Sequence, residues 1–313
     1  RPDYLDVFRA SERGNPPPNL WDYGLGTSDN PTFPGMYAWS LLSTGASLQA
    51  MELVDSGEVE CAFNIAGGLH HAAAARAAGF CYFNDAAIVI KHLLRRGRRV
   101  AYVDIDAHHG DGVQFGFYET DEVLTISIHE SGETLFPGTG FAEEIGRGRG
   151  IGHAVNVPLL AGSDDEVFLW ALDQVVPPLL TAFNPDVVVT QLGADTHRTD
   201  PLTNLAMTTT GFAEAVRRLQ PLCRRWIALG GGGYNLENVP RSWTLAWATM
   251  NAREVPDEMP GSFLTAFQRL GFRATRLRED PIPVEAATRE QAWRFVREQV
   301  HRIQRLVFPH HGL

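Results

Sequence analysis

The chain has 313 residues, of which 44% are hydrophobic and 20% charged, and no linker-like stretch divides it, so we predict one α/β domain over residues 1–313. Its formal net charge of −10 argues against direct nucleic-acid binding. Its three cysteines form no paired framework, no apolar run approaches the length of a bilayer span, and the first residues do not resemble a signal peptide, which together predict a cytoplasmic protein without a membrane partner.

Short β-rich apolar runs alternate with longer segments of helical periodicity. In chain order we predict helix 36–55, strand 62–66, helix 85–96, strand 100–105, strand 123–128, helix 164–182, strand 187–192, helix 211–223, strand 226–229, helix 239–250 and helix 288–307. A capping box of Thr288 and Gln291 is expected to begin the last helix. This alternation is typical of a mostly parallel sheet with helices on both faces.

Unusual chemistry follows directly after four of the predicted strands. Glycines and paired histidines occupy 67–71, acidic residues and histidines occupy 104–112, Gly193-Ala194-Asp195 follows the strand at 187–192, and four glycines precede Tyr234. Because the carboxyl ends of parallel strands line the crevice where ligands bind, we expect these segments to be neighbours in space.

Asp106, His108 and Asp195 are the predicted metal ligands. Asp104, Asp106 and His108 alternate at the end of an apolar strand, and buried carboxylates would repel one another without a cation between them. Three protein ligands leave positions for water and substrate, as in a catalytic site. Two carboxylates and an imidazole suit zinc but discriminate poorly against ferrous iron or cobalt.

His70 and His71 are the predicted general acid and base, because histidine titrates in the range needed to take a proton from water and give one to an amine. Asp104 and Asp111 are the spare acids that could orient the two imidazoles. Tyr234 would donate its hydroxyl to the oxyanion that forms on an attacked carbonyl. These parts predict metal-assisted hydrolysis of an amide.

The same residues carry a family resemblance. The chain resembles the zinc-dependent histone deacetylase family, which has an arginase-like, three-layer α/β fold, from about residue 1 to at least residue 250. Six motifs carry it: Gly-Gly-Leu-His-His at 67–71, Gly-Phe-Cys-Tyr-Phe-Asn-Asp at 79–85, Asp-Ile-Asp-Ala-His-His-Gly-Asp-Gly at 104–112, Phe-Pro-Gly-Thr-Gly at 136–140, Gln-Leu-Gly-Ala-Asp-Thr at 191–196 and Leu-Gly-Gly-Gly-Gly-Tyr-Asn at 229–235. The segment 24–31 is most similar to bacterial members of the acetoin-utilization type.

The resemblance implies the same ligand set, with Asp104 behind His70 and Asp111 behind His71, and His71 as the base. It also implies a narrow substrate tunnel, whose residues would be Asp29, Gly79, Phe80, Phe136 and Leu202. A structural potassium ion is implied behind the zinc, bound by Asp104, Asp106, His108, Ser127 and Ile128.

Two departures from the family pattern stand out. Family members carry a strand, several helices and a buried arginine before the segment that matches Arg1, so we expect that the chain either is truncated or lacks part of its sheet and exit channel. The second departure is His197-Arg198-Thr199, which we expect at the rim of the site, where a bulky basic pair could shape substrate choice.

These observations predict a hydrolase that removes acetyl or related acyl groups from lysine side chains of proteins or peptides and releases acetate. The alternatives are a deacetylase of small acetylated amines or polyamines and a catalytically silent acyl-lysine binding protein. Polyamine-selective relatives place a glutamate at the gate, and Leu202 offers no such charge. The two-metal arginase branch is disfavoured because 195–197 lacks a second aspartate.

Overall fold

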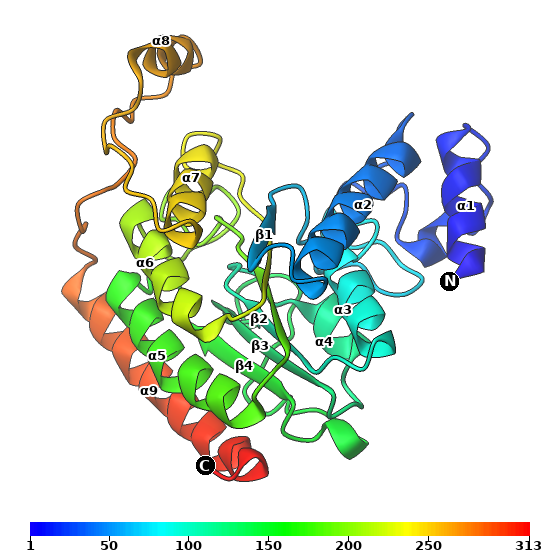
Figure 1. Cartoon of the computed structure of the whole chain (residues 1–313). Helices are drawn as coiled ribbons and strands as arrows, with labels where there is room; N and C mark the ends of the chain where they lie inside the picture. The colour runs from blue at the N-terminus through cyan, green and yellow to red at the C-terminus, as the bar shows by residue number, and fades with distance from the viewer.

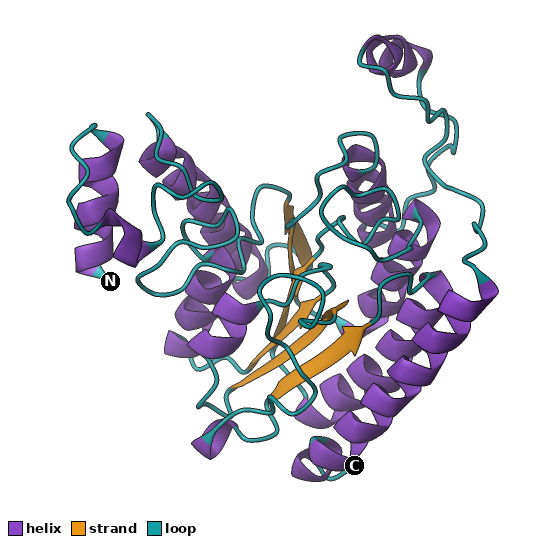
Figure 2. Ribbon diagram, turned by 180° about the vertical axis from the view of Figure 1, so that it is seen from behind, coloured by secondary structure: helices purple, strands orange, loops and turns teal.

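Six parallel strands form the single sheet at the centre of the molecule, in the order β1-β6-β5-β2-β3-β4 (Figures 1 and 2). The structure, a computed structural model, describes residues 1–313. The strands are β1 (Cys61–Asn64), β2 (Val100–Asp104), β3 (Val123–Glu130), β4 (Ala154–Leu159), β5 (Val187–Gln191) and β6 (Trp226–Leu229). Each neighbouring pair runs parallel, which confirms the predicted α/β fold.

Helices cover both faces of this sheet. The α-helices are α1 (Pro2–Glu12), α2 (Met36–Asp55), α3 (Asp85–Arg95), α4 (Asp111–Gly116), α5 (Asp165–Phe183), α6 (Thr209–Leu219), α7 (Val239–Met250), α8 (Gly261–Arg269) and α9 (Ala286–Leu306). Short 3₁₀ turns occupy Leu20–Tyr23, Gly148–Gly150, Gln220–Leu222 and Phe308–His311. The helix α8 stands apart from the sheet at the end of a long excursion between α7 and α9 (Figure 1).

The alternation of side chains along β2 builds the core on both faces. Val100 and Tyr102 pack in the cluster formed with α2, α3 and α4, whereas Ala101 and Val103 pack in the larger cluster formed with α5, α6 and α9. Successive side chains of a strand point to opposite faces, so a strand that is apolar throughout must be covered twice. Three layers follow directly from this pattern.

The predicted elements lie within a few residues of their observed bounds, but the strand β4 and the helices α1, α4 and α8 were not predicted. The segment of β4 contains Asn156 and Pro158, which weaken a strand pattern read from sequence. In the structure β4 pairs with β3 alone and forms an edge of the sheet, where a proline is tolerated because one side of the strand needs no partner. Val155, Val157 and Leu159 of β4 are nevertheless buried in the larger core cluster.

The predicted capping box was wrong. Helix α9 begins at Ala286, and its N-cap residue Glu285 makes no side-chain capping bond. Thr288 therefore lies inside the first turn. The next residue, Arg289, pairs with Asp164 and Glu166 at the start of α5, so a tertiary contact rather than a local cap holds this helix end.

One helix departs from the expectation that no segment could span a membrane. By length and composition alone α5 passes that test, but 56% of its apolar window is buried inside the molecule. It lies beside α9 and α6, and its residues Val167, Phe168 and Leu172 are in the main core cluster. Buried core helices commonly have this composition.

Candidate active site

The four strand ends singled out from the sequence belong to four consecutive strands of the sheet, β1, β6, β5 and β2. All four strands run in the same direction, so the segments that follow them emerge together at the carboxyl ends of the strands. This end of the sheet carries the histidine pair at 70–71, the acidic segment at 104–111, Asp195 and the glycine loop before Tyr234.

Asp106, His108 and Asp195 form a buried group whose ligand atoms all lie within 4.8 Å of one another. Nδ1 of His108 lies 3.0 Å from Oδ1 of Asp106 and 2.9 Å from Oδ2 of Asp195. Two carboxylates and an imidazole that converge in this way suit a divalent cation of the zinc or ferrous type. The residues therefore fit the metal that the sequence implies.

Neighbouring groups fix the two aspartates. Gln191 Nε2 and the backbone N–H of Gly232 donate to Oδ2 of Asp106 at 2.6 and 2.8 Å, and the backbone N–H of Ala107 donates to Oδ1 of Asp195 at 2.8 Å. A Cβ on Gly232 would lie 2.1 Å from Oδ2 of Asp195. Glycine is needed here because the backbone approaches the carboxylates so closely.

The charges of this group are poorly balanced without a cation. Burial and the neighbouring Asp106 carboxylate raise the pKa of Asp195. Burial lowers the pKa of His108, but hydrogen bonds and attraction to the two carboxylates outweigh it and raise the pKa to about 11. The geometry thus creates a strong negative potential that a bound cation would neutralise.

His70 and His71 form a second pair beside this group. Nδ1 of His70 lies 2.8 Å from Oδ2 of Asp104, and Nδ1 of His71 lies 2.7 Å from Oδ1 of Asp111. The Nε2 atoms of the two rings lie 3.0 Å apart. The structure thus brings together all four residues that the sequence grouped as two imidazole–carboxylate pairs.

The two histidines have opposite pKa shifts. Burial lowers the pKa of His70, but Asp104 and Asp106 outweigh it and raise the pKa to about 9. Burial and the charge of His70 lower the pKa of His71 to about 4. At neutral pH the pair therefore combines a charged ring with a neutral ring that can accept a proton.

Tyr234 follows the glycine loop that contacts the aspartates. Its backbone N–H donates to Oδ2 of Asp200 at 2.7 Å. Burial, followed by the charges of Asp106 and Asp195, raises the pKa of its phenol well above the ordinary value. The hydroxyl is therefore a neutral hydrogen-bond donor at every physiological pH.

Phe80 and Phe136 lie on either side of the catalytic candidates. The ring of Phe80 is 5.6 Å from that of Tyr234, and the ring of Phe136 is 4.9 Å from that of His71. Both side chains are nearly half exposed, at 46% and 45%. Phe80 has a φ of 64°, an uncommon conformation for a residue with a large side chain.

The other predicted substrate residues show more varied surroundings. Gly79 has a φ of +51°, and a Cβ there would lie 2.4 Å from the His71 ring, so a side chain would displace that ring. Leu202 is 42% exposed. Asp29 is exposed, and its carboxylate accepts a hydrogen bond from Ser28. A tunnel joining these five positions stays a prediction.

The residues predicted to hold potassium come from β3 and from the end of β2 with the segment that follows it. Ser127 of β3 is the register partner of Asp104 in β2. Ser127 Oγ is 2.8 Å from Nδ1 of His129, and both Ser127 and Ile128 are buried. The sheet register thus brings Ser127 next to Asp104, and the ion itself stays a prediction.

His197 was wrongly expected at the rim of the site. It is only 3% exposed, and its Nε2 lies 2.7 Å from Oε2 of Glu279, whereas the adjacent Arg198 and Thr199 are exposed. Glu279 is 82 positions away along the chain, and neither periodicity nor spacing relates it to His197.

Several supporting residues had no predicted role. Tyr102 Oη donates to Asp104 at 2.6 Å, and Gln191 donates to Asp106. The sequence contains a feature that could have identified each residue. Tyr102 is two residues before Asp104 and therefore on the same face of β2. Gln191 is a polar residue that ends an apolar strand.

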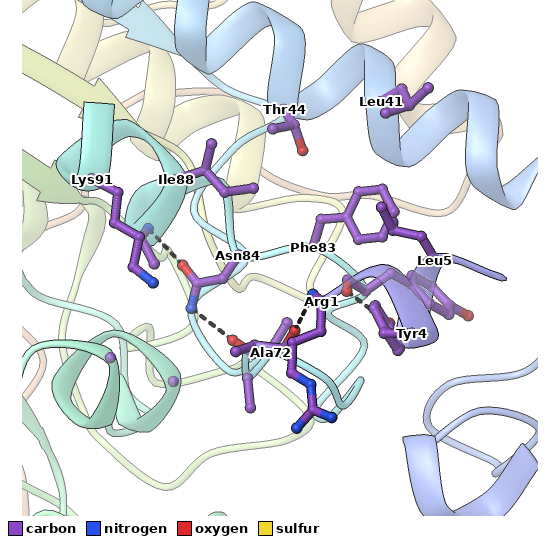
Figure 3. A pocket seen from close by; sticks show the side chains of 16 residues that line it. Arg1, Tyr4, Leu5, Leu41, Thr44, Ala72, Phe83, Asn84, Ile88 and Lys91 are labelled. Atoms are coloured by element: carbon purple, nitrogen blue, oxygen red, sulfur yellow. Dashed lines mark hydrogen bonds between the residues drawn. The ribbon is translucent and has the colours of Figure 1, made fainter. Parts of the chain in front are cut away.

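Asn84 links the site to a separate cavity. Its Nδ2 donates to the backbone carbonyls of His70 and Ala72, while its Oδ1 caps α3 at Ala87. It also lines a mostly apolar cavity of about 390 Å³ between α1, α2 and α3, shown in Figure 3, which none of the candidate site residues line. Asn84 therefore fixes the backbone of the histidine pair from behind.

Comparisons with known proteins identify the family of this chain. The sequence profile of the histone deacetylase domain matches residues 1–250. The acetoin utilization protein AcuC of Bacillus subtilis is 42% identical over 275 residues, which cover 85% of this chain and 71% of that protein. Human histone deacetylase 1 is 42% identical over 264 residues, covering 82% of this chain and 54% of that protein.

Solved structures lead to the same family. The crystal structure of an HDAC homologue complexed with SAHA superposes with a TM-score of 0.86 at 35% identity, covering 95% of this chain and 83% of that one. The structure of an HDAC homologue from Aquifex aeolicus gives a TM-score of 0.85 at 34% identity, with the same coverage. The chain therefore belongs to the histone deacetylase family of metal-dependent hydrolases.

Proposed function

We propose that this protein is a zinc-dependent lysine deacylase, which hydrolyses the amide of acetyl-lysine or a related acyl-lysine in a protein or peptide and releases acetate. The observation that carries the proposal is the juxtaposition of the Asp106, His108 and Asp195 group with the histidine pair, 3.9 Å from Oδ1 of Asp106 to Nε2 of His70. The names of the relatives, which are histone deacetylases and an acetoin utilization protein, support the same reaction class.

Asp106, His108 and Asp195 would hold the metal. When bound, a divalent cation supplies Lewis-acid polarisation of the acyl carbonyl and acidifies water. Tyr234 donates its neutral hydroxyl to the oxyanion that develops on the carbonyl. One preorganised donor of this kind typically contributes about 10²- to 10³-fold in rate.

The histidine pair accepts and donates the protons of the reaction. His71 is neutral at pH 7 because its pKa is lowered to about 4, so it can accept the proton that water loses on attack. His70, whose pKa is raised to about 9, carries the positive charge held by Asp104. The lysine amine leaves only when it is protonated. A protonated imidazole of the pair would donate that proton.

The substrate would enter between Phe80 and Phe136, whose rings flank Tyr234 and His71. We assign the methylene stem of lysine to these rings, the substrate amide N–H to the carbonyl of Gly79, and the substrate backbone to Asp29. Leu202 adds an aliphatic wall. Asp29 is the only acid among these five residues and it is exposed, and Leu202 offers no charge to a polyamine.

Zinc is the proposed metal, with ferrous iron as the competing ion, because the ligand set accepts both. Potassium is proposed as a structural ion bound by Asp104, Asp106, the backbone of His108, Ser127 and the backbone of Ile128. The proposed setting is the cytoplasm, with acetylated proteins or peptides rather than nucleic acid as partners, consistent with the net charge of −10.

A substrate panel tests this proposal. The metal-loaded protein should release acetate from an acetyl-lysine peptide, and Asp195→Asn, which removes a proposed ligand, should be inactive. Hydrolysis of acetylspermidine without turnover of the peptide would replace the lysine assignment by the polyamine alternative. Binding of the peptide without turnover of any substrate would instead favour the silent binding protein.

A further inference from the structure

A largely buried ionic cluster connects the loop that carries Asp195 with helix α7, which follows the Tyr234 loop. It consists of His197, Arg241 and Glu279, which we call the Glu279 strap. The carboxylate of Glu279 accepts from His197 Nε2 at 2.7 Å through Oε2 and from Arg241 at 3.0 Å through Oε1. His197 and Arg241 are each 3% exposed. A hydrogen-bonded cluster of this kind fixes the segments that contribute to it.

The hydrogen bonds define the orientation of each group. Arg241 can only donate, so Oδ1 of Asn238, at 3.1 Å, must face it. The Nδ2 of Asn238 then faces Nδ1 of His197 at 2.7 Å, and the backbone N–H of Thr199 points at the same nitrogen. Nδ1 of His197 is therefore an acceptor, and Nε2 is the donor to Glu279.

Short segments of chain connect the Glu279 strap to the candidate site residues. His197 is two residues after Asp195, and Asn238 is four residues after Tyr234. The turn after His197 holds the tyrosine loop directly, because Asp200 accepts from the backbone N–H of Tyr234 at 2.7 Å. Asn235 adds bonds to the carbonyl and hydroxyl of Thr199 at 3.0 and 2.9 Å.

Glu279 comes from a segment that the histone deacetylase profile does not cover, since the profile match ends at residue 250. The segment descends from α8 past α6 to α9 (Figure 1). Thr210 exchanges hydrogen bonds with the backbone of Glu279, and Thr209 donates to the carbonyl of Leu277 at 2.8 Å. The carboxylate is thus presented from a fixed position outside the two loops that it joins.

We propose that Glu279 is a positioning residue for catalysis. By binding His197 and Arg241 together, it holds the Asp195 loop against the Tyr234 loop and so sets the place of the tyrosine hydroxyl relative to the metal ligands. This inference rests on the proposed function of Tyr234 and Asp195. Misplacing a catalytic group by about 1 Å can cost about 10²-fold in rate.

The test compares Glu279→Gln with Glu285→Gln, a matched control at an exposed glutamate for which the structure gives no side-chain bond. Glu279→Gln should lower kcat about 10- to 100-fold with KM within about 3-fold, because a donor that acts mainly in the transition state is displaced. Zinc content should stay at the wild-type level. Glu279→Asp, which keeps the charge, should recover part of the rate and covers the case in which the glutamine variant does not fold.

A double-mutant comparison separates positioning from general damage. In a Tyr234→Phe background, Glu279→Gln should lower kcat by less than about 3-fold, since the hydroxyl that it positions is already missing. Multiplicative losses, with Glu279→Gln costing as much without the tyrosine hydroxyl as with it, would overturn the proposal.

A binding measurement keeps the proposal independent of turnover. A hydroxamate is a metal-chelating group whose oxygens would meet the proposed metal and the Tyr234 hydroxyl, so its affinity for the zinc-loaded protein should fall at least about 10-fold in Glu279→Gln and stay unchanged in Glu285→Gln. Equal hydroxamate affinities in both variants would contradict the positioning role of Glu279. A wild-type protein that binds the hydroxamate yet hydrolyses no acyl-lysine would contradict the proposed function. The hydroxamate affinities of the two variants would then still decide whether Glu279 has its positioning role.

Discussion

Nε2 of His70 and Nε2 of His71 lie 3.0 Å apart, while the opposite nitrogen of each ring faces its own aspartate. Two protonated rings would direct N–H groups at one another across this contact, so protonation of one ring opposes protonation of the other. Burial affects both rings, and the difference comes from the charges: Asp104 and Asp106 surround His70, whereas His71 faces the charged His70. The pair thus divides into a cation and a neutral base.

The first prediction concerns Asp104→Asn. Removing this carboxylate removes the largest attraction that raises the pKa of His70, so that pKa should fall by about one unit or more. A raised pKa keeps a histidine charged up to higher pH, and lowering it should move the basic limb of the kcat/KM profile to lower pH. An unchanged basic limb in Asp104→Asn would show that His70 does not control it.

Tyr234→Phe should separate chemistry from binding. The variant loses only a hydroxyl, and we expect kcat to fall about 10²- to 10³-fold with little change in KM. Zinc content measured on the purified variant should match wild type, because Tyr234 is not among the proposed ligands. A wild-type kcat in Tyr234→Phe would remove the tyrosine from the mechanism.

Metal removal should destabilise the protein. Without a cation, Asp106 and Asp195 remain buried close together, and burial and the Asp106 charge raise the pKa of Asp195. A chelator should therefore lower the Tm of the wild type, and zinc should restore it. Asp195→Asn should bind zinc weakly and show little response to either addition. An identical chelator effect in Asp195→Asn would place the metal elsewhere.

The sequence predicted the fold because the strands that matter are buried on both faces. Strand β2 is apolar through Val103 and ends on Asp104, so its pattern needs no tertiary information. Strand β4 was missed because Asn156 weakens the strand pattern and Pro158 is tolerated only at a sheet edge, and position in the sheet is a tertiary property.

The grouping of the candidate site residues was predictable for a similar reason. The residues assigned to metal binding and proton transfer follow strands directly, so strand order alone brings Asp106 and Asp195 together. The Glu279 strap could not be predicted, because it joins His197 to a residue 82 positions away through an irregular segment. Neither periodicity nor spacing encodes such a contact, so the sequence alone groups His197 with its exposed neighbours.

The last prediction concerns acid stability and Glu279. Burial raises the pKa of this carboxyl, but the hydrogen bond from His197 and the charge of Arg241 outweigh it and hold the pKa at about 2, below the ordinary 4.5. A depressed pKa stabilises the folded protein above the ordinary value, and this contribution is lost as pH falls toward 2. It amounts to at most about 3 kcal/mol. Glu279→Gln should therefore be less stable than wild type at neutral pH.

The difference in unfolding free energy between Glu279→Gln and wild type should shrink as pH falls from about 4.5 to about 2, because the wild-type carboxyl is then protonated and loses the same attraction to Arg241. Urea unfolding at several pH values measures this difference directly. Glu285→Gln should track wild type at every pH, since its exposed carboxyl has no ion-pair partner. A Glu279→Gln deficit that stays constant across this range would mean that the lost stability comes from packing, and that the ion pair with Arg241 contributes none of it.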